Sequence, residues 1–271
     1  MAGDLSVTAL YTAEVWRWGG LPYAHLFATP EGRRVFDATN AALWLARGAP
    51  LRIALLQRHA MIDHLLRWHL AHAPRCGRVL ELAAGLSRRG AAFAGAVEYT
   101  EVDLPPVIRR KRELLERTAE GRAVLGRLRL VEGDLETLAL EELAPRGEPV
   151  LVIAEGLLPY LPGDARRRLF AKVRRLGDVR FVFDLTPADE EPPAGLAGRA
   201  LEAVMKRFTG GRTFERDART RGQIADELMA AGWDVAEAVA ARDVVDAWRL
   251  PFPEQRTATV VFSAAARATP R

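Results

Sequence analysis

The stretch Val79-Leu80-Glu81-Leu82-Ala83-Ala84-Gly85-Leu86-Ser87-Arg88-Arg89-Gly90 begins as a short apolar run, turns through small residues and opens into a helical pattern. A second strand pattern follows, Val97-Glu98-Tyr99-Thr100-Glu101-Val102-Asp103, and it ends in an acid. A strand, a small-residue turn, a helix and a strand ending in a carboxylate form the layout of a nucleoside-binding βαβ unit. At such a turn a ligand can approach the backbone, and the acid can accept hydrogen bonds from two ribose hydroxyls.

The glycine spacing of this turn argues against a dinucleotide. If Gly85 is the middle glycine of the pyrophosphate fingerprint, the first falls on Ala83 and the third on Arg88. A single glycine after the strand suits a nucleoside ligand without phosphates, such as S-adenosylmethionine. An ordinary strand-to-helix turn of an α/β protein is the alternative that this stretch alone leaves open.

Composition places the chain among globular proteins with a sizeable core. It has 271 residues, of which 49% are hydrophobic and 27% charged, and its formal net charge is +4. Acids are interspersed among the arginines, so the charge pattern does not favour nucleic-acid binding. With Cys76 as the sole cysteine, no intrachain disulfide can form. No signal-peptide pattern and no apolar run of about 20 residues is found, so we expect a cytoplasmic protein.

Hydrophobic periodicity predicts alternating strands and helices after a helical N-terminal region. Helices are expected within 4–75, chiefly at 33–47 and 53–73, and then at 107–119, 164–175, 196–208 and 220–231. Strands are expected at 79–82, 97–103, 129–135, 150–156, 179–184, 233–237 and 257–263. This order predicts a doubly wound, seven-stranded, mostly parallel sheet whose final strand is antiparallel. We expect a helical cap of residues 1–75 and a cofactor-binding domain of residues 76–271.

Polar residues follow several of the predicted strands. Gly85, Asp103, Asp134, Glu155 and Asp184 each lie at a predicted strand end. In doubly wound sheets, ligands bind at the carboxyl ends of the strands. We therefore expect these five residues to converge on one edge of the sheet.

At this point the sequence resembles the leucine carboxyl methyltransferase family, and within it the bacterial branch of tetracenomycin-type polyketide O-methyltransferases. The resemblance keeps its order and spacing from about residue 6 to 163. It rests on Thr8–Ala13, on Gln57-Arg58-His59-Ala60-Met61-Ile62-Asp63, on Leu80–Ser87, on Glu101-Val102-Asp103-Leu104-Pro105, on Gly133-Asp134-Leu135 and on Ala154-Glu155-Gly156-Leu157-Leu158-Pro159-Tyr160-Leu161. It implies a class I, Rossmann-like methyltransferase that uses S-adenosylmethionine.

The resemblance also implies roles for single residues. Arg58 would reach the methionine carboxylate of the cofactor, and Glu155 would lie near its amino group. Gly85 would let the backbone approach the cofactor, with Glu81 in the same wall of the pocket. Asp103 would hold the ribose hydroxyls. The adenine would be flanked by Asp134 and Leu135.

The chain departs from the family in the opening turn. The family usually has glycine at the position of Ala83, and often Asp-Thr-Arg where this chain has Ser87-Arg88-Arg89. An alanine methyl is expected to be tolerated at position 83 if its backbone lies in an ordinary region of φ/ψ.

The implied reaction is methyl transfer to a carboxylate or phenolic hydroxyl of a small, polyketide-like acceptor. Tyr160 is a candidate at the pocket mouth, or else a packing tyrosine. Arg212, in a Gly-Gly-Arg turn, is a candidate clamp for a substrate carboxylate, or else a surface arginine. Two alternatives remain, methylation of a protein C-terminal carboxyl group and a non-catalytic, cofactor-binding scaffold.

No metal site is predicted. His59, His64, His69 and His72 share one helix, but their spacing lacks the i, i+4 pair that would place two ligands on one face. Ser87 lacks the second glycine of a nucleophile elbow, which argues against a hydrolase.

Overall fold

Strand β4 (Val150–Ala154) lies in the middle of the sheet, and all five of its residues are buried. It pairs in parallel with β1 (Arg78–Leu82) and with β5 (Val179–Leu185). Burial on both faces explains why its sequence is a continuous apolar run. The computed structural model describes residues 7–45, 51–72, 76–144, 148–190, 217–255 and 257–267.

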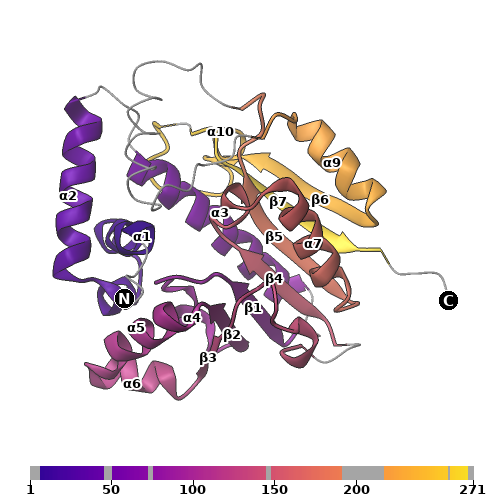
Figure 1. The fold of residues 1–271 in the computed structure, drawn as a ribbon. Coiled ribbons are helices and arrows are strands. Elements are labelled where there is room, and N and C mark those ends of the chain that lie inside the picture. The colour runs from indigo at the N-terminus through magenta and orange to yellow at the C-terminus, as the bar shows by residue number, and fades with distance from the viewer. Residues whose placement is uncertain are drawn as a thin grey trace. The chain divides into compact units, whose positions relative to one another are not determined.

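The described strands form a seven-stranded sheet in the order β3-β2-β1-β4-β5-β7-β6 (Figure 1). The order reverses between β1 and β4, which is the switch point of a doubly wound sheet. Strand β7 (Val260–Ala266) runs antiparallel to both β5 and β6 (Trp233–Ala240). The predicted α/β class, the mostly parallel sheet and the antiparallel final strand are therefore confirmed.

Contacts divide the described residues into two compact units. The first holds residues 7–45, 51–56 and 84–133; the second holds 57–72, 76–83, 134–144, 148–190, 217–255 and 257–267. Helix α3 (Leu51–His72) begins in the first unit and ends in the second. The division into a cap of residues 1–75 and a domain of residues 76–271 stays a prediction.

The first unit combines N-terminal helices with two parallel strands. Its further elements are α1 (Val7–Trp18), η1 (Ala24–Phe27), α2 (Pro30–Leu45), α4 (Arg89–Phe93), β2 (Glu98–Asp103), α5 (Pro105–Glu116), α6 (Ala119–Leu125) and β3 (Leu128–Glu132). Helices α1 and α2 pack through Tyr11 and Phe36, whose rings stack with centroids 5.6 Å apart. Strands β2 and β3 pair from Tyr99↔Leu128 to Asp103↔Glu132.

Two predicted boundaries in this part of the chain are wrong. The strand expected at 129–135 ends at Glu132, and the N–H of Gly133 donates to the carbonyl of Asp103 at 2.9 Å. The single helix expected at 107–119 is followed by a second one, α6. Its N-cap is Thr118, whose side chain accepts a hydrogen bond from the N–H of Gly121.

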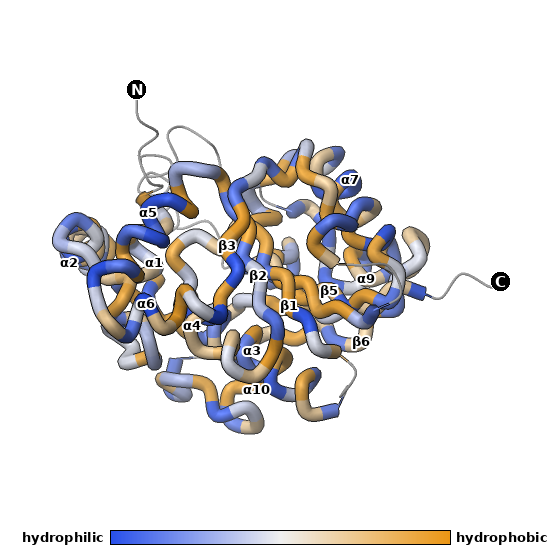
Figure 2. The backbone as a smooth tube through the Cα atoms, turned by 90° about the horizontal axis from the view of Figure 1, so that it is seen from below, coloured by the Kyte–Doolittle hydropathy of each residue, from blue (hydrophilic) through white to orange (hydrophobic). Residues whose placement is uncertain are grey.

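The second unit carries the rest of the sheet. Its further elements are η2 (Leu140–Glu142), η3 (Leu158–Tyr160), α7 (Gly163–Arg174), α9 (Arg221–Ala230) and α10 (Ala241–Val244). An aromatic cluster packs α7 against the strands, with Phe170 edge-on to Phe183 at 5.0 Å and Phe183 stacked on Phe262 at 5.3 Å. In Figure 2 the tube along β1 and β5 is largely orange, as expected for strands buried in a core. Among the described helices, none combines the length and apolar character needed to cross a membrane.

Candidate functional site

In the first unit, Gly85 and Asp103 are joined directly. Asp103 is the last residue of β2, and its Oδ2 accepts a hydrogen bond from the backbone N–H of Gly85 at 2.7 Å. Its Oδ1 accepts from the N–H of Leu104, also at 2.7 Å. Gly85 has φ +53, a conformation that favours glycine, while a Cβ there would meet only ordinary contact at 3.7 Å. Glycine is therefore favoured at position 85 by the positive φ, and not by a lack of room for a side chain.

A buried ion pair supports β2 beneath Asp103. The side chains of Glu101 and Lys111 are both 0% exposed and form an ion pair between β2 and α5. The Lys111 ammonium lies 5.1 Å from the centroid of the Phe27 ring. A side chain at Gly90 would clash with the Glu101 carboxylate, so only glycine fits at this position without a shift of its neighbours. This packing fixes the strand that ends in Asp103.

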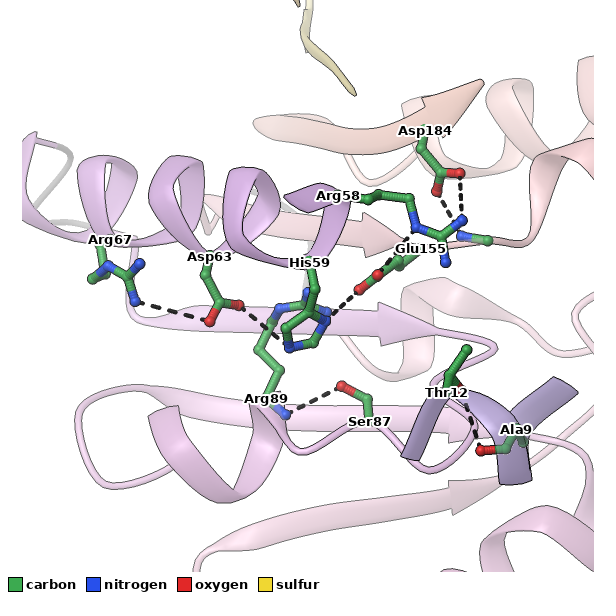
Figure 3. Close-up of polar contacts among 11 residues, drawn as sticks. Ala9, Thr12, Arg58, His59, Asp63, Arg67, Ser87, Arg89, Glu155 and Asp184 are labelled. Carbon is green, nitrogen blue, oxygen red and sulfur yellow. Dashed lines mark hydrogen bonds and ion pairs between the residues drawn. The ribbon is translucent and has the colours of Figure 1, made fainter. Parts of the chain in front are cut away.

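In the second unit, Arg58 of α3 lies between two carboxylates (Figure 3). Its Nε donates to Glu155 Oε1 and its Nη1 to Asp184 Oδ2, each at 3.2 Å. Glu155 directly follows β4, and Asp184 lies near the end of β5. Burial alone would lower the pKa of the Arg58 guanidinium, but Asp184 and Glu155 outweigh burial and raise it.

Gly156 completes this cluster. Its N–H donates to Asp184 Oδ1 at 2.6 Å, and its φ is +65. A Cβ at this position would lie 3.0 Å from Arg58 Nη2, so the missing side chain leaves room beside that nitrogen. Among the described residues, Nη2 makes no hydrogen bond within the protein. A guanidinium has five N–H donors, and a bound carboxylate could use those of Nη2.

Asp184 is a strand-end acid with an unusual environment. Burial raises its pKa, although Arg58 and the Gly156 N–H both act to lower it. The sequence placed Asp184 at a strand end but did not assign it to the cofactor. In the structure its carboxylate is paired with Arg58.

His59 was missed as a member of this cluster. Its Nδ1 lies 2.8 Å from Glu155 Oε2, and its side chain is 0% exposed. Its Nε2 lies 3.9 Å from Asp63 Oδ1, one helical turn further along α3. The His59–Asp63 spacing of i, i+4 is visible in the sequence, but Glu155 is 96 residues away.

The remaining predicted residues lie as follows. Glu81 is the fourth residue of β1, 1% exposed and in register with Ile153 of β4. Asp134 is exposed and accepts the N–H of Glu136 at 2.9 Å, and Lys172 Nζ donates to the carbonyl of Leu135 at 2.7 Å. These three residues each belong to the second unit, and their contact with a cofactor stays a prediction.

Of the two candidates for substrate positioning, only Tyr160 lies within the described residues. Tyr160 is the last residue of η3 and is half-buried. Burial, Asp184 and Glu155 have the largest effects on the pKa of Arg58, and Tyr160 adds a smaller electrostatic effect that raises it. Tyr160 therefore lies near the Arg58 cluster. Arg212, together with the helix expected at 196–208, lies outside the described residues.

Ala83 does not meet the condition under which its methyl was expected to be tolerated. Its φ is +51, in the left-handed region that L-residues other than Gly, Asn and Asp rarely adopt. A glycine, the usual residue of the resembling family, would take this conformation without strain. Four residues on, Ser87 Oγ accepts the N–H of Arg89 at 3.1 Å, at the start of α4.

Comparisons with known proteins identify the family to which the chain belongs. A family model described as leucine carboxyl methyltransferase matches residues 21–174. A Mycolicibacterium smegmatis protein provisionally named an S-adenosyl-L-methionine-dependent methyltransferase is 32% identical over 149 residues, which are 52% of this chain and 42% of that protein. The tetracenomycin polyketide synthesis O-methyltransferase TcmP of Streptomyces glaucescens is 35% identical over 109 residues, or 39% of this chain and 38% of TcmP. The chain thus spans less than half the length of these two relatives.

Among solved structures, a provisionally named methyltransferase from Thermobifida fusca YX superposes with a TM-score of 0.62. The match covers 98% of this chain and 96% of that one at 14% sequence identity. At this identity the likeness supports the fold alone.

Proposed function

Because the chain belongs to the leucine carboxyl methyltransferase family, we propose that it transfers a methyl group from S-adenosylmethionine to an oxygen of a small-molecule acceptor. The acceptor would carry a carboxyl or phenol group, as in polyketide-like acids. The Arg58–Glu155 pair is the observation that carries this proposal. It sets a cation and a carboxylate 3.2 Å apart, and the amino-acid end of the cofactor presents the opposite pair of charges.

The chemistry of the donor set fits this cofactor. Arg58 Nη2, beside the space left open by Gly156, would bind the methionine carboxylate. Glu155 would accept the ammonium. Asp103, whose two oxygens are held by backbone N–H groups, would accept the two ribose hydroxyls.

Four further residues would complete the cofactor contacts. Gly85 would let the backbone come close to the cofactor, and Glu81 would contact it as well. Asp134 and Leu135 would flank the adenine, and Lys172 would hold that segment through the carbonyl of Leu135.

Methyl transfer from a sulfonium is an in-line displacement, for which S-adenosylmethionine supplies the electrophilic methyl group. The protein has to align acceptor oxygen, methyl and sulfur and to exclude water. A carboxylate acceptor, with a pKa near ~4, is already ionised at neutral pH and needs no base. His59 is completely buried, so this imidazole cannot reach an acceptor as a base. Tyr160 and Arg212 would position the acceptor.

The test is mass spectrometry of a panel of small acids and polyphenols incubated with the protein and isotopically labelled cofactor. We expect a methylated product whose label is lost under mild alkali, which identifies an ester. A label that survives alkali would identify an ether and a phenolic acceptor. Absence of S-adenosylmethionine and S-adenosylhomocysteine binding in calorimetry would refute the proposal, whereas cofactor binding without transfer would favour the scaffold alternative.

A further inference from the structure

His59 lies at the centre of a chain of charged groups in the second unit. Figure 3 shows the contacts that run from Arg67 through Asp63 and His59 to Glu155. Arg67 Nη1 lies 3.8 Å from Asp63 Oδ2, and the side chain of Asp63 is only 4% exposed. Of the two carboxylates beside His59, Glu155 lies at hydrogen-bond distance, 2.8 Å from Nδ1, and Asp63 lies 3.9 Å from Nε2. A hydrogen bond from a carboxylate can orient a histidine, as in a catalytic triad.

The burial of His59 decides which role it can have. The imidazole has no exposed surface, so it does not touch a substrate. Its Nδ1, however, lies at hydrogen-bond distance from Glu155, one of the two residues proposed to bind the amino-acid end of the cofactor. Any effect of His59 on the reaction therefore passes through Glu155.

Consecutive residues of α3 hold the two oxygens of Glu155. Arg58 Nε binds Oε1 and His59 Nδ1 binds Oε2. Without His59, the Glu155 carboxylate would be drawn toward a bidentate pair with the guanidinium, the geometry that an arginine and a carboxylate prefer. In that pair each charge would satisfy the other, and neither would be available to a zwitterionic ligand.

We propose that His59 is a positioning residue for the amino-acid end of S-adenosylmethionine: it holds Glu155 Oε2 away from Arg58, so that Glu155 binds the ammonium and Arg58 binds the carboxylate. This inference rests on the proposed function. It predicts that His59 matters for ligands with the amino-acid end and is irrelevant for ligands that lack it.

The experiment compares two ligands by calorimetry on the full chain at neutral pH. S-adenosylhomocysteine carries the amino-acid end, and 5′-methylthioadenosine shares only the thioether nucleoside. We expect His59→Leu to weaken binding of S-adenosylhomocysteine about tenfold or more, the worth of one hydrogen bond to a charged group. Binding of 5′-methylthioadenosine should not change.

Two amide variants keep the test decisive if His59→Leu fails to fold. The amide nitrogen of His59→Asn can take the place of Nδ1 and should restore S-adenosylhomocysteine affinity to within about threefold of the original chain, less than a lost hydrogen bond costs. His59→Gln places its amide nearer the position of Nε2 and should bind as weakly as His59→Leu. The matched control is His69→Leu, a buried histidine on the same helix outside the cluster. It should leave both affinities unchanged.

Each remaining outcome points to a different failure. If the unsubstituted chain binds neither ligand, the proposed function is wrong and the inference with it. If it binds both, but His59→Leu and His59→Gln lose both ligands equally or lose neither, the proposed function stands and the role of His59 is refuted.

Discussion

The backbone of Ala83 leads to a prediction whose size follows from the structure. With φ +51, this alanine pays the steric cost of the left-handed region, about 1–2 kcal/mol for an L-residue. Ala83→Gly removes that cost but adds the conformational entropy that glycine loses on folding, roughly 0.5–1 kcal/mol. The side chain of Ala83 is half-buried, so loss of the methyl changes little. We expect a net stabilisation of about 0.5–1 kcal/mol.

Ala84→Gly is the matched control, one residue further along the chain. Ala84 is 7% exposed and does not have a positive φ. Its replacement loses a buried methyl, worth about 0.8 kcal/mol, and adds the same glycine entropy without relief of strain. In urea unfolding, Ala83→Gly should therefore have a higher free energy of unfolding than the original chain, and Ala84→Gly a lower one. In a thermal scan, Ala83→Gly should raise Tm by about 1–4 °C. If both variants are destabilised alike, Ala83 is not strained and the reasoning fails.

Three further changes test other parts of the structure. Lys111→Met leaves the buried Glu101 carboxylate without its cation and should cost about 3–5 kcal/mol in urea unfolding; a cost below about 1 kcal/mol, typical of an exposed pair, would contradict this reading. Gly156→Ala adds a methyl 3.0 Å from Arg58 Nη2 and should weaken S-adenosylhomocysteine binding about tenfold, a loss of roughly one hydrogen bond to a charged group. Gly177→Ala is the control, because Gly177 also has a positive φ but a Cβ there would meet no atom within 4 Å. This variant should lose stability and keep its affinity for S-adenosylhomocysteine. If both variants bind S-adenosylhomocysteine equally, the contact between the added methyl of Gly156→Ala and Arg58 does not affect binding. Burial lowers the pKa of His69 from 6.5 to about 4, so the unfolded chain takes up its proton first as pH falls. Stability should therefore drop as the pH falls between these values, and His69→Gln should remove that part of the drop in urea unfolding at pH 7 and pH 4; an unchanged pH dependence in the variant would show that His69 is not the source.

The sheet could be predicted because the patterns that indicate its strands involve residues close together in the sequence. The continuous apolar run of β4 and the acids that close β2 and follow β4 depend on residues next to one another. Boundaries failed where the cause was distant. The strand expected to continue to Leu135 stops at Glu132, where the next residue, Gly133, is bonded to Asp103 of the neighbouring strand. Helix α6 was missed although Thr118 is a good N-cap, because no apolar period marked a second helix there.

The candidate site was predictable in its residue types and not in its pairings. Glu155 and Asp184 were singled out by charge and position at predicted strand ends, and Arg58 by the resemblance to the family. That Asp184 binds Arg58, and that His59 binds Glu155, depends on contacts between residues 126 and 96 positions apart. The strain at Ala83 was equally hidden, because a single alanine gives no sign of its φ. A departure from a family pattern becomes informative when the backbone conformation at that residue is known.

Three consecutive residues of α3 each form hydrogen bonds with residues far away in the sequence. The Nε2 of Gln57 donates to the carbonyls of Pro251, Phe252 and Gln255, Arg58 binds Glu155 and Asp184, and His59 binds Glu155. Successive side chains on a helix point about 100° apart, since a turn has 3.6 residues. One helical turn therefore holds the loop before β7, the end of β5 and the residue after β4, all within the second unit. Exchanging Gln57 for an apolar residue would free the loop before β7, whereas exchanging Arg58 or His59 would remove one of the two contacts that hold Glu155.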